Sequence, residues 1–188
     1  MLLLQAIRFE GLNPFIALIS ALGNGAVIWI LLGVVLAIFA ESRKTGVAML
    51  VSVLVTWILC FIIGNVVGRP HPCEEVQGLV AVVGVSHSGY SFPSFHAATA
   101  GAALAVIIRA RDGRLAMPVF IFAVLEVFSR LYLGVDYPSD CLVGVILGIA
   151  VGFIVSFLLS NLSFDMEQNV KRKSVGKGRA TRSKTRRS

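Results

Sequence analysis

The sequence predicts an all-α protein: a membrane helix bundle of about five transmembrane helices, preceded by a short amphipathic N-terminal helix. The first observation is composition, because 56% of the 188 residues are hydrophobic and 14% are charged, whereas soluble domains carry about 25% charged residues. The second is that the apolar residues form long blocks, each close to the roughly 20 residues with which a helix crosses a bilayer. The third is that basic residues gather between and after these blocks.

The apolar blocks define five expected spans, at about 13–40, 45–67, 93–108, 115–131 and 139–161. The first contains a weak point at Gly23-Asn24-Gly25, so we expect a short helix followed by a longer one. The second stops at Gly68-Arg-Pro-His-Pro72, because proline lacks a backbone donor and clashes with the preceding turn. Residues 68–92 form the longest connection, and loops of this length are commonly functional. Met1–Leu12 is expected to lie at the membrane interface.

The net charge of +7 belongs to the C-terminal end of the chain. Residues 165–188 contain nine Lys and Arg against two acidic residues, whereas residues 1–164 are balanced. We therefore expect a membrane-embedded domain at 1–164 and a disordered basic tail at 165–188. Because Lys and Arg accumulate on the cytoplasmic side, the tail should be cytoplasmic. It should contact anionic lipids rather than nucleic acid.

Counting spans back from the tail fixes the orientation of the rest. The basic segments Arg109–Arg114 and Arg43-Lys44 then fall on the cytoplasmic side as well, which agrees with the positive-inside rule. The same count places residues 68–92 and 133–138 together on the outer face. Ionisable groups near the ends of membrane helices usually mark function. We therefore expect a multi-pass protein of the cell membrane with its site on the outer face.

Three short segments at this face carry the chemistry: Pro93-Ser-Phe-His96, Ser129-Arg130 and Gly134-Val-Asp-Tyr-Pro-Ser-Asp140. They resemble the second and third motifs, PSGH and SRxxxGxHxxxD, of the type 2 phosphatidic acid phosphatase family. That family includes undecaprenyl-diphosphate phosphatases and is related to vanadium haloperoxidases. The resemblance covers nearly the whole chain before the tail, with Phe95 in place of the family's glycine. It implies a hydrolase for lipid phosphates, and we expect no cofactor.

The resemblance also implies roles for individual residues. In the family, a third-motif histidine attacks phosphorus, the aspartate four residues later orients it, and the second-motif histidine protonates the leaving oxygen. Carried over, the candidate catalytic residues are His96 as general acid, Asp136 at the nucleophile position and Asp140 as orienting carboxylate. The candidate phosphate ligands are Ser94 and Arg130, with Arg69 or His71 supplying part of the first motif's charge.

Two departures bear on activity. Asp136 stands where the family has its nucleophilic histidine, and an anion beside a phosphate raises the barrier unless cations compensate it. The first motif, KxxxxxxRP, aligns with His71-Pro72 or with Arg69-Pro70, and neither alignment supplies the lysine. If Asp136 limits activity, Asp136→His should raise it. Aspartate accepts phosphoryl groups in other enzymes, usually with a metal ion nearby.

Other interpretations remain open at this point. His71, His87, His96, Asp136 and Asp140 all lie on the outer face and suit zinc, although no short ligand spacing supports a metal site. The leading hypothesis is hydrolysis of a lipid phosphomonoester or diphosphate, of isoprenoid diphosphate or phosphatidic acid type. The alternative is a catalytically inactive family member that binds lipid phosphate or assists another membrane protein.

Glu126 lies one helical turn before Arg130 inside the fourth span. Side chains four residues apart on a helix are neighbours, so the spacing predicts an ion pair between these two residues.

Overall fold

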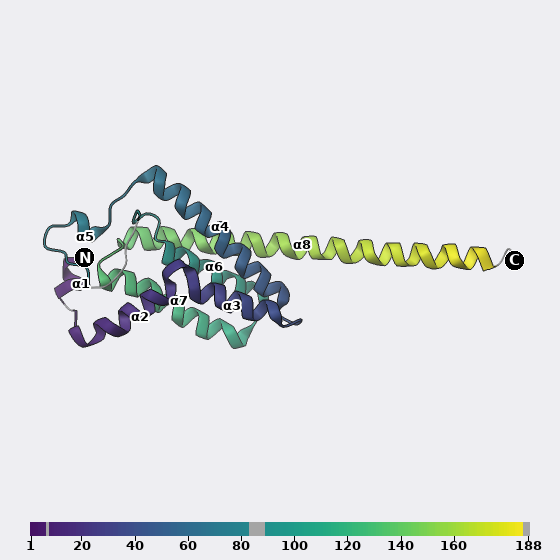
Figure 1. The fold of residues 1–188 in the computed structure, drawn as a ribbon, viewed down its shortest axis with the longest axis horizontal. Coiled ribbons are helices and arrows are strands. Elements are labelled where there is room, and N and C mark those ends of the chain that lie inside the picture. Colours follow the sequence, from purple (N-terminus) through teal and green to yellow (C-terminus); the bar gives the residue numbers. More distant parts are fainter. Residues whose placement is uncertain (7, 83–88, 186–188) are drawn as a thin grey trace. The chain divides into compact units, whose positions relative to one another are not determined.

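The computed structural model describes residues 1–6, 8–82 and 89–185, with side chains up to residue 161 (Figure 1). All regular elements in these ranges are helices, which confirms the all-α class. Within the described residues, four stretches are long and apolar enough to cross a membrane, and a fifth helix is apolar but shorter. The four are Glu10–Ile38, Arg43–Glu75, Gly113–Leu133 and Pro138–Asn161, and the fifth is Phe95–Ala110.

The N-terminal third contains a short helix followed by a broken span. Its elements are α1 (Leu2–Ala6), η1 (Glu10–Leu12), α2 (Asn13–Gly23), η2 (Asn24–Ala26) and α3 (Val27–Ile38). The predicted weak point is confirmed, because α2 ends at Gly23 and Gly25 has φ +60°. Glycine adopts positive φ without a steric penalty. The break matters because Asn24 at this point reaches His96.

The remaining spans follow the predicted order. They are α4 (Arg43–Val67), the short α5 (Pro72–Glu75), α6 (Phe95–Ala110), α7 (Gly113–Leu133) and α8 (Pro138–Thr185). The third span begins at Phe95, two residues later than the predicted Pro93, because Ser94 caps the helix. The Ser94 Oγ accepts a hydrogen bond from the Ala97 N–H at 3.4 Å, which satisfies one of the free donors of the first turn.

Helix α8 extends beyond its predicted end at residue 161 and is helical as far as Thr185. The backbone of most of the segment 165–188, expected to be disordered, is therefore helical. A helix that continues from an existing span adds one hydrogen bond per residue without a new nucleus, and Lys and Arg are good helix formers. The chain divides into two compact units, Met1–Ser156 and Phe157–Ser188. The division into a domain at 1–164 and a cytoplasmic tail at 165–188 stays a prediction.

Helix α6 lies at the centre of the first unit and packs against α4 and α7 (Figure 1). Its contact with α8 is between backbones, because α8 presents glycine to α6 once per turn. A Cβ at Gly148 would overlap the carbonyl oxygen of Ala98, and one at Gly144 would lie 2.6 Å from the Ser94 carbonyl oxygen. Small residues of this kind let membrane helices approach closely. The contact places the first turns of α6 and α8 side by side.

The outer surfaces of the spans are apolar. Large hydrophobic side chains are exposed on every long helix, including Ile38, Phe61, Met117, Leu142 and Ile154. Such a surface would be an aggregation site in water, whereas lipid tails solvate it. The exposed side chains therefore agree with a multi-pass membrane protein.

Candidate active site

The predicted site residues meet at the end of the bundle where α7 ends and α6 and α8 begin (Figure 1). Arg130 lies in the last turn of α7, Ser94 caps α6, and Asp136 lies in the loop between α7 and α8. The backbone N–H of Ser94 donates to the carbonyl oxygen of Asp140 at 3.1 Å. The close approach of α6 and α8 thus joins the second and third motifs directly.

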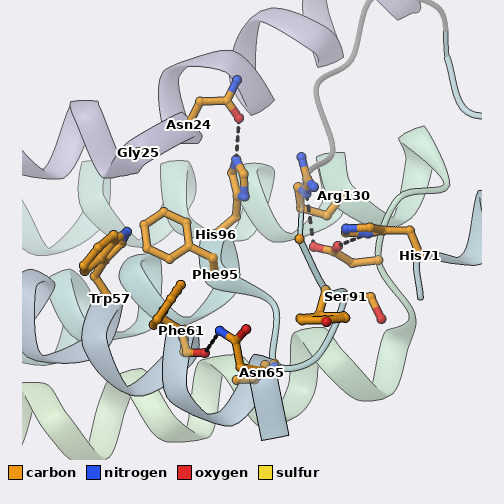
Figure 2. A pocket seen from close by; sticks show the side chains of 16 residues that line it. Asn24, Gly25, Trp57, Phe61, Asn65, His71, Ser91, Phe95, His96 and Arg130 are labelled. Carbon is orange, nitrogen blue, oxygen red and sulfur yellow. Dashed lines mark hydrogen bonds and ion pairs between the residues drawn. The ribbon is translucent and has the colours of Figure 1, made fainter. Parts of the chain in front are cut away.

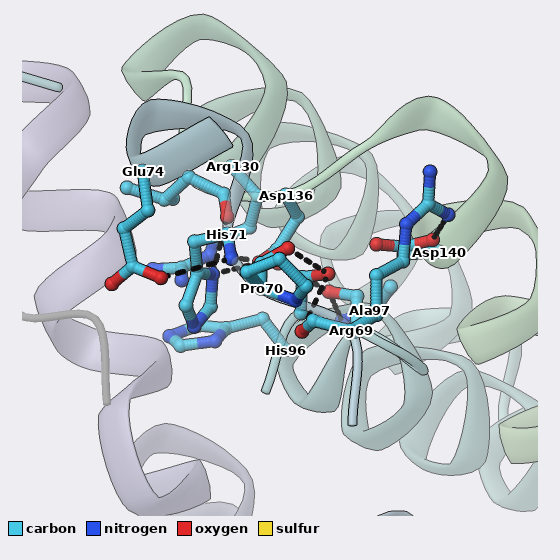
Figure 3. A network of polar contacts seen from close by, with 12 residues as sticks. Arg69, Pro70, His71, Glu74, His96, Ala97, Arg130, Asp136 and Asp140 are labelled. Atoms are coloured by element: carbon cyan, nitrogen blue, oxygen red, sulfur yellow. Dashed lines mark hydrogen bonds and ion pairs between the residues drawn. The ribbon is translucent and has the colours of Figure 1, made fainter. Parts of the chain in front are cut away.

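Asp136 is the centre of a buried polar network (Figure 3). Its Oδ2 accepts a hydrogen bond from the Ser94 Oγ at 2.7 Å and one from the Arg130 Nε at 3.1 Å. Its Oδ1 lies 3.5 Å from the His71 Nδ1. Burial by itself would raise the pKa of this carboxyl, but the Arg130 charge and the hydrogen bonds hold the pKa well below its usual range. Asp136 is therefore a stable carboxylate.

Arg130 is buried and connects the site to α2. Its guanidinium contacts Asp136 through Nε and donates through Nη1 to the Ser20 Oγ at 2.9 Å. A buried charge is tolerated only when it is paired and hydrogen-bonded. Asp136 supplies the opposite charge and Ser20 a further hydrogen bond, and together they fix the guanidinium beside Asp136.

His71 stands just before α5, with its ring directed at the same loop. The His71 Nδ1 lies 2.6 Å from the carbonyl oxygen of Val135. The segment that carries His71 is held in place by Ser91, whose N–H donates to the Arg69 carbonyl oxygen and whose Oγ donates to that of Pro70, both at 2.9 Å. His71 is 3% exposed, so the ring is part of the site interior.

A second ion pair lies beside the first. The Arg69 Nη1 is 2.6 Å from the Asp140 Oδ1 and 3.0 Å from the Ser139 Oγ. The guanidinium also covers the ring of Tyr137, with 3.8 Å from its carbon to the ring centroid. Asp140 is fully buried, whereas the Arg69 side chain is 35% exposed. The carboxylate expected to orient the residue at 136 is thus held by Arg69.

His96 faces α2 and η2. Its Nε2 lies 3.2 Å from the Ser20 carbonyl oxygen and 3.1 Å from the Asn24 Oδ1. Because a carbonyl oxygen can only accept, the hydrogen of the neutral ring is on Nε2. The Nε2 hydrogen is thus directed at acceptors on α2 and η2, and these two elements fix the orientation of the ring.

A cavity of about 540 Å³ opens onto these residues (Figure 2). His71, His96, Arg130 and Asp136 line it at one side. Aromatic rings from α4, from the loop before α6 and from α6 line the rest, namely Trp57, Phe61, Tyr90 and Phe95. Apolar walls with a few convergent polar groups are typical of a binding pocket. The combination suits an amphiphile with a charged head.

The structure corrects the prediction for Glu126. Its Oε2 accepts a hydrogen bond from the Trp29 Nε1 at 2.9 Å, while Arg130 turns to Asp136 and Ser20. The i, i+4 rule describes an isolated helix surface, and here a buried indole donor on α3 and a carboxylate on the next loop provide better partners.

Ser20, Asn24 and the Val135 carbonyl group belong to the site but were missed in the sequence. Ser20 and Arg130 are separated by 110 residues, so no motif spacing connects them. The available signal was that Ser20 and Asn24 are polar residues inside an apolar span, which usually marks a functional contact.

The metal interpretation can be examined only in part, since His87 lies outside the described residues. Within the described ranges, no group of three or more His, Cys, Asp and Glu side chains is arranged to hold a metal ion.

Comparison with known proteins decides the family. The family model of the PAP2 superfamily matches residues 45–163. The chain belongs to this superfamily. The match includes the second and third motifs and both ion pairs, and therefore the whole cluster around Asp136.

Relatives of this superfamily member are lipid phosphatases by name. A lipid A 4'-phosphatase of Bacteroides thetaiotaomicron is 29% identical over 153 residues, covering 74% of this chain and 68% of that protein. An undecaprenyl-diphosphatase of Sulfolobus acidocaldarius is 27% identical, covering 72% and 65%. A decaprenylphosphoryl-5-phosphoribose phosphatase of Mycobacterium tuberculosis is 33% identical, covering 69% and 70%. The chain thus spans about two thirds of the length of these relatives.

Solved structures agree with the fold. The crystal structure of LpxE from Aquifex aeolicus superposes with a TM-score of 0.71 at 25% identity, covering 81% of this chain and 90% of that one. A phosphatidylglycerolphosphate phosphatase from Bacillus subtilis superposes with a TM-score of 0.61 at 22% identity, covering 85% and 80%. The second similarity supports the fold alone.

Proposed function

We propose that this PAP2 superfamily member hydrolyses a phosphomonoester or diphosphate of a membrane lipid. The observation that carries the proposal is the cavity in which His71, His96 and Arg130 face a pocket with aromatic walls. Phosphoryl transfer depends mainly on positioned cations and proton donors. The aromatic side of the cavity gives the first carbons of a lipid chain an apolar place beside these groups.

We further propose that the site opens at the outer face of the membrane. The exposed basic residues Arg43 and Lys44 begin α4, and Arg109, Arg111 and Arg114 flank the turn between α6 and α7. The site residues belong to the opposite ends of these helices. Since basic residues near membrane helices are mostly cytoplasmic, the site end is expected outside. The cytoplasmic tail and its contact with anionic lipids belong to the same proposal.

A second candidate function is a protein that binds lipid phosphate without hydrolysing it or that assists another membrane protein. The observation in its favour is that Asp136 already takes the hydrogen bonds of Ser94 and Arg130, the two residues assigned to phosphate. Arg69 is likewise engaged, by Asp140. An incoming phosphate would have to compete with both carboxylates.

The test is phosphate release by the protein purified in detergent, from undecaprenyl diphosphate and from phosphatidic acid, with and without added divalent metal. We expect release that falls by about 100-fold or more in Arg130→Ala and in His96→Ala, because each removes charge stabilisation or the acid from the reacting groups. Arg109→Ala is the matched control, since Arg109 is exposed at the other end of α6.

Equal losses in the Arg109 and Arg130 variants would point to damage of the fold rather than of the site. No release from either lipid by the wild-type protein, under conditions where both lipids bind, would favour the second candidate function.

A further inference from the structure

We propose that His71 is the nucleophile of this protein and that Asp136 orients it. The inference rests on the proposed hydrolase function and names the residue that carries out its chemistry. The family pattern has an imidazole at position 136 and a guanidinium at position 71, under the alignment with His71-Pro72. This chain has a carboxylate at 136 and an imidazole at 71, so the site has kept a histidine at a different position.

The first support is the orientation of the ring. The His71 Nδ1 is 2.6 Å from the Val135 carbonyl oxygen, which can only accept a hydrogen bond. Nδ1 therefore carries the hydrogen of the neutral ring, and the lone pair is on Nε2. A histidine held through one nitrogen by an acceptor, with the lone pair on the other, is the arrangement that nucleophilic and basic catalysis require.

The second support is the place of Asp136. Its Oδ1 lies 3.5 Å from the same Nδ1, and its other oxygen is fixed by Ser94 and Arg130. A ring that attacks phosphorus through Nε2 becomes positively charged, and a fixed carboxylate beside Nδ1 stabilises that charge. At this position the negative charge of Asp136 is an advantage, whereas beside an attacking aspartate oxygen it would repel the phosphate.

The third support is what Asp140 does instead. In the family it orients the histidine at position 136, but here it is bound to Arg69 at 2.6 Å. That ion pair, with the Tyr137 ring beneath the guanidinium, anchors the segment two residues before His71. Arg69 and Asp140 then position the nucleophile through the backbone.

The reaction balances with the groups present. The Nε2 lone pair forms a bond to phosphorus as the bond from phosphorus to the lipid oxygen breaks. A leaving lipid phosphate departs as an anion, and a leaving alkoxide takes a proton from His96 in its imidazolium form, which solvent later restores. Water then attacks phosphorus, the nitrogen–phosphorus bond breaks, and its electron pair returns to Nε2. Both protons of the water leave with dihydrogen phosphate, and His71 is neutral again.

The test separates a nucleophile from a phosphate-binding cation with two substitutions. His71→Arg supplies the charge that the family has at this position but no nucleophile, and His71→Asn keeps a donor near Nδ1. We expect both variants to lose phosphate release from undecaprenyl diphosphate or phosphatidic acid by about 1,000-fold or more. Thermal unfolding in detergent reports whether each variant is folded. The double variant His71→Arg with Asp136→His restores the family pattern and should regain release.

A covalent intermediate gives an independent readout. Wild-type protein, mixed with the same lipids carrying a labelled terminal phosphate and quenched in alkali, should retain label that acid removes, which is the behaviour of phosphohistidine. An acyl phosphate on Asp136 would be destroyed by alkali and by hydroxylamine. Imidazole added to a folded His71→Gly variant should restore part of the release.

The outcomes distinguish this inference from the proposed function. Release by the wild type together with full or increased release by His71→Arg would overturn the assignment of His71 and leave the hydrolase intact. Full release by Asp136→Asn alone would do the same, since that change removes the orienting carboxylate without supplying a nucleophile. Absence of release by the wild type from both lipids would overturn the hydrolase and this inference together.

Discussion

The two ion pairs at the site have the same chemistry but different surroundings. Arg130 and Asp136 are 3% and 2% exposed, and additional partners on α2, α6 and the segment before α5 hold them. Asp140 is also buried, but the Arg69 side chain is 35% exposed and rests on the half-buried ring of Tyr137. Water can replace much of the charge stabilisation that Arg69 gives to Asp140. It can replace little of the charge stabilisation that Arg130 gives to Asp136. The Arg130–Asp136 pair should therefore contribute more to the stability of the fold than the Arg69–Asp140 pair, although its nitrogen–oxygen distance is the longer of the two.

The largest expected effect follows from Arg130→Met. The substitution leaves Asp136 as a buried carboxylate without its cation, and breaking a buried pair in this way costs about 3–5 kcal/mol. We expect a clear loss of thermal stability in detergent, measured by intrinsic fluorescence or by the onset of aggregation. Little change in the melting temperature would mean that His71 and Ser94 alone stabilise the carboxylate.

A smaller effect is expected from the matched substitution Arg69→Met. Asp140 keeps the hydrogen bond from the Ser139 Oγ at 3.0 Å, and solvent reaches the place that Arg69 leaves. A cost of about 1–2 kcal/mol is expected, below that of Arg130→Met. The comparison is sharp because both variants exchange arginine for methionine within one site, and equal losses in unfolding titrations would refute it.

The smallest effect is a dependence on pH that separates Asp136 from its neutral analogue Asp136→Asn. The pKa of this carboxyl is lowered in the folded protein from its ordinary value of 3.8. A lowered pKa contributes stability that is present above about pH 4 and is lost as the pH falls through the folded value. The stability advantage of the wild type over Asp136→Asn should therefore be constant from pH 5 to 8 and shrink below pH 4. If the wild type remained more stable than Asp136→Asn by the same amount down to pH 3, the difference in stability would come from packing and not from the charge of Asp136.

Much of the fold could be predicted from the sequence because it depends on local properties. Apolar block length predicted the spans, and Gly23-Asn24-Gly25 predicted the break between α2 and α3. The motifs predicted that Ser94, Arg130 and Asp136 would converge, which they do. The residue roles that the family resemblance implies stay predictions, because geometry alone does not test them.

The parts that could not be predicted depend on contacts between distant segments. The choice of Glu126 between Arg130 and Trp29 depends on how α3 packs against α7. The approach of His71 to the Val135 carbonyl group depends on where the chain returns after α4.

The close contact of α6 and α8 has a consequence for how such a site can change. Glycines of α8 lie against the backbone of α6, and the Ser94 N–H is bonded to the Asp140 carbonyl group. The frame that sets the second motif beside the third is thus independent of the side chains that point into the cavity. A scaffold of this kind tolerates the exchange of one reacting group for another without refolding, so an imidazole and a carboxylate can be redistributed around the same phosphate position while the bundle stays as it is.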